Sequence, residues 1–191
     1  MLAVSCFSVF AAASCASYDQ LIEKDQLCQV KWADLEANLQ RRADLIPNLV
    51  ATVKAAAAQE QATLTKVIEA RASATSIHLT AEDTQDPEKM KAFQAAQDQL
   101  KGALSRLLVV QEQYPDLKSN GNFRDLQVQL EATENRILRA REEYNRVVGE
   151  YNSEIGKVKG RIIKRATGGT FQIRPYFAAS AGSDVAPKVT F

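Results

Sequence analysis

Gln40-Arg41-Arg42-Ala43-Asp44-Leu45-Ile46-Pro47-Asn48-Leu49-Val50-Ala51-Thr52-Val53-Lys54 is the stretch that decides the fold of this chain. Apolar residues recur in and around it at intervals of three, four or seven, which places them on one face of an α-helix. This pattern predicts a single helix from about residue 18 to residue 77, with a buried stripe formed by Trp32, Leu35, Leu39, Ala43, Ile46, Val50, Val53, Ala57, Leu64 and Ile68. Pro47 removes the amide that would bond to the carbonyl of Ala43, so we expect it to kink this helix.

A second helix is predicted to begin at Asp86-Pro87-Glu88. Asp is a good N-cap, Pro suits the first helical position, and Glu favours the positive end of the helix dipole. Pro115 is expected to end this helix, whose stripe comprises Phe93, Ala96, Leu100, Leu104, Leu107, Gln111 and Tyr114.

A third long helix follows a polar connection at 114–122 that contains one short turn. We expect Asn122 to cap it and Gly168-Gly169 to end it. Its predicted stripe is Phe123, Leu126, Leu130, Thr133, Ile137, Tyr144, Val148, Tyr151, Ile155, Val158 and Ile162.

These elements predict an all-α fold, an antiparallel bundle of three to four long helices with an extended C-terminal tail. A fourth helix results if Pro47 or the connection at 114–122 splits a segment. The predicted organisation is a signal or anchor at 1–17, the bundle at 18–168 and the tail at 169–191, whose last residues, 187–191, are expected to strap onto the bundle.

The composition excludes several function classes. The chain has 191 residues, 24 Lys and Arg, and 23 Asp and Glu, so its balanced charge gives no drive toward nucleic acid. With three Cys and one His, it cannot assemble a usual zinc site or a di-iron bundle. No phosphate loop, nucleophile elbow or other catalytic motif is present, and His78 is interpreted as a solvated loop residue. We therefore predict no catalytic, metal or cofactor-binding residues.

The N-terminus predicts attachment to a membrane. Residues 1–18 carry no charge, and Ala12-Ala13-Ser14-Cys15 is similar to a lipoprotein processing site, which would make Cys15 the lipidated first residue and leave Cys28 as an unpaired thiol. The alternative is an uncleaved anchor helix.

A few polar residues lie on or beside the apolar stripes. Arg42 is expected either to pair with Glu134 or Glu131 on the third helix, which would set the register of the two helices, or to reach solvent past its own stem. Tyr144 is interpreted as bundle core, with a pocket lining as the alternative. The basic residues at 157–165 are interpreted as a solvated helix end or, alternatively, as a contact for anionic lipid or polymer.

Several of these stretches together resemble the LemA family. They are Trp32, the block at 40–50, Thr52-Val53-Lys54, Ala70-Arg71-Ala72, Asn122-Phe123, Leu126-Gln127, the block at 130–137, Tyr144-Asn145, Tyr151-Asn152, Arg174-Pro175-Tyr176-Phe177 and the final Pro187, Val189 and Phe191. The sequence departs from the family where Ala55-Ala56-Ala57-Ala58 and residues 157–173 stand in place of Gly- and aromatic-rich segments, which puts the end of the third helix in question.

The resemblance implies a membrane-attached, extracytoplasmic, all-α bundle in a bacterial cell envelope, with no enzymatic activity. The expected function is that of a non-enzymatic scaffold or interaction module with an envelope protein as partner. The alternative is a binding module that holds a small ligand near Arg42, Tyr144 and Glu134, and a hydrolase is the third hypothesis.

Overall fold

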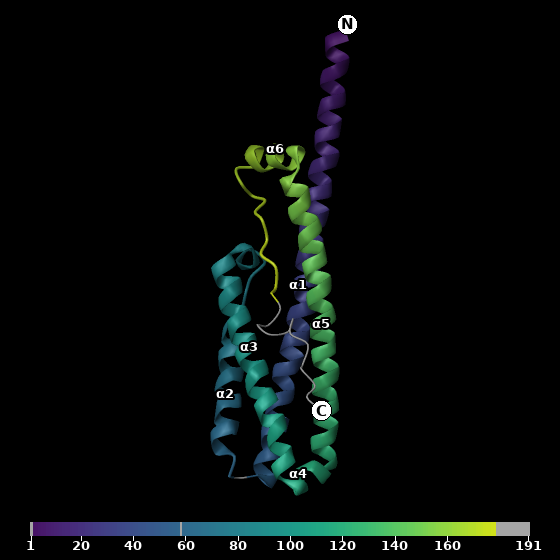
Figure 1. Ribbon diagram of the computed structural model, residues 1–191. Coiled ribbons are helices and arrows are strands. Elements are labelled where there is room, and N and C mark those ends of the chain that lie inside the picture. Colours follow the sequence, from purple (N-terminus) through teal and green to yellow (C-terminus); the bar gives the residue numbers. More distant parts are fainter. Residues whose placement is uncertain (1, 58, 179–191) are drawn as a thin grey trace, which may run out of the picture.

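The computed structural model describes residues 2–57 and 59–178. Regular structure in these residues is entirely helical, as predicted, and forms a bundle whose long helices alternate in direction (Figure 1). The elements are α1 (Leu2–Ala56), α2 (Gln61–Ser76), η1 (Asp83–Gln85), α3 (Pro87–Val110), η2 (Gln111–Gln113), α4 (Pro115–Ser119), α5 (Gly121–Gly156) and α6 (Val158–Ala166).

The prediction of one helix from residue 18 to residue 77 is wrong. α1 continues through Pro47 to Ala56, and the chain then turns so that α2 runs back beside it. The turn shifts the buried positions: Val67 is fully buried, whereas Ile68, predicted to be buried, is 52% exposed. Alanines at 55–58 do not favour a break, so the reversal comes from packing, which lets α2 bury its apolar face against α1 and α3.

The start of α3 is confirmed, because the Asp86 side chain accepts hydrogen bonds from the amides of Glu88 and Lys89. The cap predicted for the third helix is wrong. Asn120 caps α5 and accepts a hydrogen bond from the Phe123 amide at 3.1 Å, whereas Asn122 lies in the first turn.

The third helix also ends earlier than predicted. α5 stops at Gly156, Lys157 is extended, and α6 crosses the end of the bundle. Gly160 allows this close turn, because a Cβ there would lie 2.3 Å from the Glu154 carbonyl oxygen. The predicted glycine cap is present, with Gly168 and Gly169 at φ values of 64° and 87°, but it ends α6 and not the third long helix.

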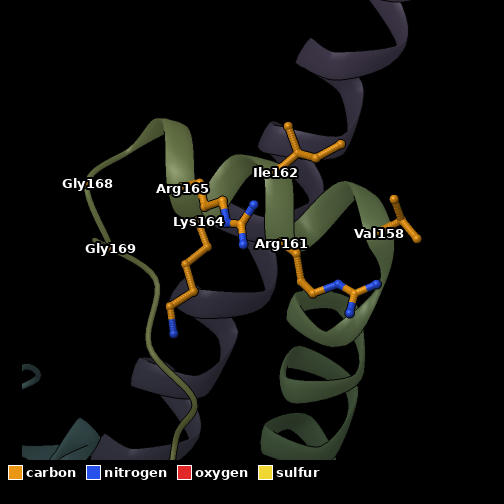
Figure 2. A pocket seen from close by; sticks show the side chains of 7 residues that line it. All are labelled: Val158, Arg161, Ile162, Lys164, Arg165, Gly168 and Gly169. Carbon is orange, nitrogen blue, oxygen red and sulfur yellow. The ribbon is translucent and has the colours of Figure 1, made fainter.

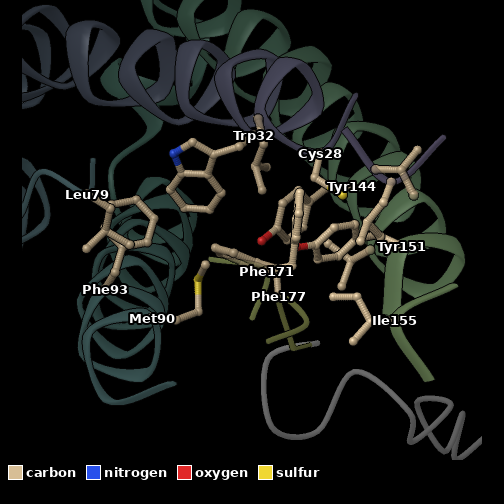
Figure 3. Packing of buried hydrophobic residues seen from close by; sticks show 14 of the residues in the cluster. Cys28, Trp32, Leu79, Met90, Phe93, Tyr144, Tyr151, Ile155, Phe171 and Phe177 are labelled. Carbon is tan, nitrogen blue, oxygen red and sulfur yellow. The ribbon is translucent and has the colours of Figure 1, made fainter. Parts of the chain in front are cut away.

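The core consists of two apolar clusters stacked along the bundle. The upper cluster joins α1, α3 and α5 with the tail and includes Trp32, Phe93, Tyr144, Tyr151 and Phe177 (Figure 3). The lower cluster runs from Ile46 and Leu100 down to Leu117 and Phe123. Residues 170–178 are extended, as predicted for the tail, and Phe171 and Phe177 in them belong to the upper cluster. The strap predicted at 187–191 lies outside the described residues.

Candidate functional site

A buried polar layer separates the two clusters. Arg42 on α1 is 2% exposed and donates from Nη1 to Glu134 Oε1 on α5 at 2.9 Å. Its Nη2 donates to the side-chain oxygen of Gln97 on α3 at 2.7 Å, and Gln97 Nε2 donates to the carbonyl of Ala74 on α2. The Arg42 guanidinium thus joins α1 to α3 and α5, and Gln97 extends the connection to α2.

The predicted pairing of Arg42 with Glu134 is thus present, and snorkelling to water is not. The side chain of Glu134 is 34% exposed, so solvent moderates its attraction for Arg42. Gln97 is the buried partner that sequence reasoning missed. Arg42 Nε is buried without a hydrogen-bond partner in the described part of the chain, which limits what this layer adds to stability.

Pro47 is accommodated by a residue from α2. The carbonyl of Ala43, which loses its helical donor because proline has no amide hydrogen, accepts a hydrogen bond from Arg71 Nε at 2.8 Å. Arg71 thus replaces the bond that Pro47 removes and ties α2 to α1 at this point.

Two asparagines on α5 clamp the extended tail. Asn152 accepts from the amide of Arg174 at 2.9 Å and donates to its carbonyl at 2.8 Å. Asn145, two helical turns earlier, makes the same pair of bonds with Phe177, at 2.8 and 2.9 Å. Each asparagine thereby satisfies both polar groups of one tail residue, as a neighbouring strand would.

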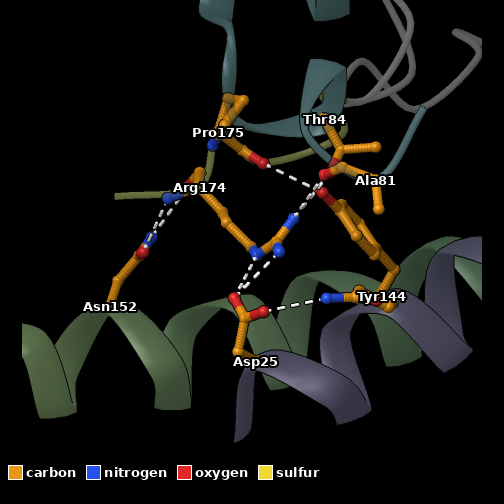
Figure 4. Close-up of polar contacts among 8 residues, drawn as sticks. Asp25, Ala81, Thr84, Tyr144, Asn152, Arg174 and Pro175 are labelled. Atoms are coloured by element: carbon orange, nitrogen blue, oxygen red, sulfur yellow. Dashed lines mark hydrogen bonds and ion pairs between the residues drawn. The ribbon is translucent and has the colours of Figure 1, made fainter. Parts of the chain in front are cut away.

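Arg174, the tail residue held by Asn152, also makes a buried ion pair through its side chain. Its side chain is 1% exposed and holds Asp25 Oδ1 on α1 from Nε at 3.1 Å and from Nη2 at 2.8 Å (Figure 4). Nη1 donates to the hydroxyl of Thr84 at 2.6 Å, and the guanidinium lies 5.6 Å from the centre of the Tyr151 ring. The Arg174 guanidinium thus connects the tail to α1, η1 and α5.

Tyr144 lies in the core, next to Trp32, and its hydroxyl donates to the carbonyl of Pro175 at 3.4 Å. Burial raises the pKa of Tyr144 far above its ordinary value, so it stays a neutral donor. Tyr144 belongs to the upper cluster and does not line a cavity with Arg42 and Glu134 as the binding alternative predicted.

Glu131 faces a different environment. It does not pair with Arg42 but lines an open groove of about 300 Å³ between α3 and α5, together with Glu134, Leu104, Leu108 and Leu130.

The described residues were compared with the requirements of a metal site and of a membrane span. They contain no group of three or more His, Cys, Asp or Glu side chains placed to hold a metal ion, and His78 is exposed in the loop after α2. In the described helices, no stretch is long and apolar enough to cross a membrane. The side chain of Cys15 lies outside the described residues, so its lipidation stays a prediction.

Comparison with known proteins identifies the family of this chain. The model of the LemA family matches residues 31–191. Magnetosome protein MamQ 2 of Paramagnetospirillum magneticum and magnetosome protein MamQ of Magnetospirillum gryphiswaldense are each 26% identical over 208 aligned residues, spanning all of this chain and 75% of each relative.

Proposed function

The chain belongs to the LemA family, and on that premise we propose that it is a non-enzymatic scaffold of the cell envelope, anchored to a membrane by its N-terminus. The observation that carries this proposal is the continuity of α1. One helix runs from the uncharged N-terminal stretch into the core, where Arg42 connects it to α5 and Asp25 connects it to the tail. An anchor at residues 1–17 would therefore be coupled directly to the bundle.

Two further observations support a scaffold. The buried charges in the described residues take part in contacts that hold helices and tail together. The groove between α3 and α5 is lined by leucines and by polar side chains that include Glu131, Glu134 and Lys101. The relatives' names associate them with magnetosomes, which accords with a role in assembly at a cell structure.

Fractionation of cells that express the full chain tests the anchor. We expect the protein to remain with membranes through a high-salt wash and to be released by detergent, whereas a variant that lacks residues 1–17 should be soluble. Mass spectrometry of the mature N-terminus then separates a lipid on Cys15 from an uncleaved helix. Release of the full chain by salt alone would contradict anchoring.

Photocrosslinking from the groove tests the scaffold. A photoreactive residue at Ser105, which lines the groove, should capture a defined envelope protein, and one at exposed Glu69 on α2 should not. Equal capture from both positions, or none from Ser105, would contradict a scaffold that uses this groove.

The binding alternative keeps one observation in its favour, which is the volume of the groove. About 300 Å³ is the lower limit for a small-molecule pocket. A ligand in the groove should raise the melting temperature, and above its Kd the rise should follow the logarithm of the ligand concentration.

A further inference from the structure

α6 has two chemically different faces. Gly160 and Ile163 are buried against the bundle. Val158 and Ile162 are 65% and 54% exposed, and at 100° per residue they lie about 40° apart on the outer face. Arg161 and Arg165 flank them on one side and Lys159 on the other, so an apolar stripe is bordered by cations.

Within the described part of the chain, the cations of α6 are not paired with a carboxylate. In residues 18–57 and 59–178, no carboxylate forms an ion pair with Lys159, Arg161, Lys164 or Arg165. A hollow of about 630 Å³ opens beside Arg161, Lys164 and Arg165 (Figure 2). Figure 2 also shows Ile162 pointing away from the body of the bundle.

The position of α6 along α1 shows which part of the chain the exposed face of α6 lies beside. The Tyr18 ring on α1 meets Phe171, just after α6, edge to face at 5.9 Å, and both Leu21 and Ile163 belong to the upper cluster. α6 therefore lies where the uncharged stretch at 1–18 gives way to the charged body. It runs across the direction of α1, which continues past it toward the N-terminus (Figure 1).

We propose that α6 is a membrane-contact helix that lies on the anionic phospholipid headgroups of the bilayer that holds the N-terminus. A helix with an apolar stripe between rows of cations binds in the plane of such a surface. Val158 and Ile162 enter the headgroup region, and the flanking cations neutralise lipid phosphates. With α1 as a second attachment, this contact fixes the tilt of the bundle, and it rests on the anchoring proposed above.

Quenching of a tryptophan by lipid tests this contact in the full chain. The single native tryptophan, Trp32, is buried, so the unmodified protein supplies the baseline. An Ile162→Trp variant and a control, Val128→Trp, are reconstituted into vesicles of phosphatidylcholine brominated near its headgroup, with or without phosphatidylglycerol. Val128 is 64% exposed on α5, far from α6.

We expect quenching of the Ile162→Trp variant to exceed that of the control by about twofold or more in vesicles with phosphatidylglycerol, since an interfacial helix places this position at headgroup depth. Adding Arg161→Gln and Arg165→Gln, or omitting phosphatidylglycerol, should remove about half or more of the excess. Equal quenching at both positions would overturn the proposal. The same result is expected if α6 binds an anionic polymer and not lipid. An excess indifferent to both arginines and phosphatidylglycerol would overturn the assignment of anionic lipid.

Recovery of protein with the vesicles separates the two proposals. Full recovery without excess quenching would leave the anchor intact and remove the role of α6. Failure of the full chain to remain with vesicles of either composition would overturn the anchor and, with it, the contact of α6.

Discussion

At the scale of single residues, Arg174 is the side chain whose loss should matter most. Arg174→Ala leaves Asp25 and Thr84 without their shared donor in a buried place, and breaking such a pair costs about 3 kcal/mol or more. Arg174→Lys keeps the charge but not the fork, so it should recover only part of that loss. Arg124→Ala, at an exposed arginine on α5, is the control and should change stability by less than about 0.5 kcal/mol.

Chemical denaturation gives the free energy of unfolding for these variants. Equal losses for Arg174→Ala and Arg124→Ala would contradict a structural role for the buried pair.

Cys28 offers a second residue-scale prediction. Burial raises its pKa to about 11 from an ordinary value of 9.0. The buried thiol therefore contributes stability that is fully present below pH 9.0 and is lost as pH rises toward about 11, because the unfolded chain ionises first. At pH about 8, a maleimide should not label Cys28 until the protein is unfolded.

The same labelling counts the thiols of the mature protein. If Cys15 is the lipidated first residue, denatured protein should show Cys28 as the single reactive thiol. If the N-terminus is kept as an uncleaved anchor, all three cysteines should react.

At the scale of elements, the tail is held by side chains on a helix, not by a strand. Asn152→Ala removes two hydrogen bonds to Arg174, together worth about 1–3 kcal/mol. We expect the amide of Arg174 to exchange about fivefold to a hundredfold faster, measured by hydrogen exchange of the peptide that covers 170–178. Asn38→Ala, whose amide bonds only within α1, should leave this exchange unchanged. Unchanged exchange in Asn152→Ala would mean that Arg174 alone holds the tail.

Element boundaries show where sequence reasoning succeeds and fails. The start of α3 was predictable because Asp86 and Pro87 specify a cap by local chemistry. The break after Ala56 was missed because the alanines around it favour helix. At Gly156 the departure from the family at 157–173 put the end of the helix in question, but Gly156 and Gly160 alone do not specify a break. Both breaks are decided by what the following segment can pack against, which a local pattern does not contain.

The same contrast applies to the candidate site. A charge within an apolar stripe needs a partner or a path to solvent, and of these two expectations for Arg42 the structure shows the pair with Glu134. Asn145 and Asn152 were missed, although each directly follows a tyrosine of the predicted stripe and the two tyrosines are seven residues apart. That spacing places both on one side of α5, but only the fold shows that the tail runs along that side.

At the scale of the whole molecule, the polar layer interrupts one long core. Arg42, Gln97 and Thr133 are buried at one level, with Leu39, Phe93 and Ile137 on one side of it and Ile46, Leu100 and Leu130 on the other. A continuous apolar seam permits long helices to slide by a turn, whereas a guanidinium that needs Gln97 and Glu134 together does not. We therefore expect the layer to contribute more to the register of the helices than to the stability of the bundle.

Replacing the layer with apolar residues separates register from stability. Arg42→Ala alone should destabilise the bundle by about 2 kcal/mol, because it leaves the Gln97 oxygen buried without its donor. Arg42→Met with Gln97→Leu and Glu134→Leu removes all three polar groups, so the free energy of unfolding should equal or exceed that of the native chain. Without the layer the helices lose their single register, and NMR spectra of the triple variant should show broadened or doubled amide signals from residues on both sides of it. A triple variant as uniquely ordered as the native protein would show that packing of the two clusters alone fixes the register.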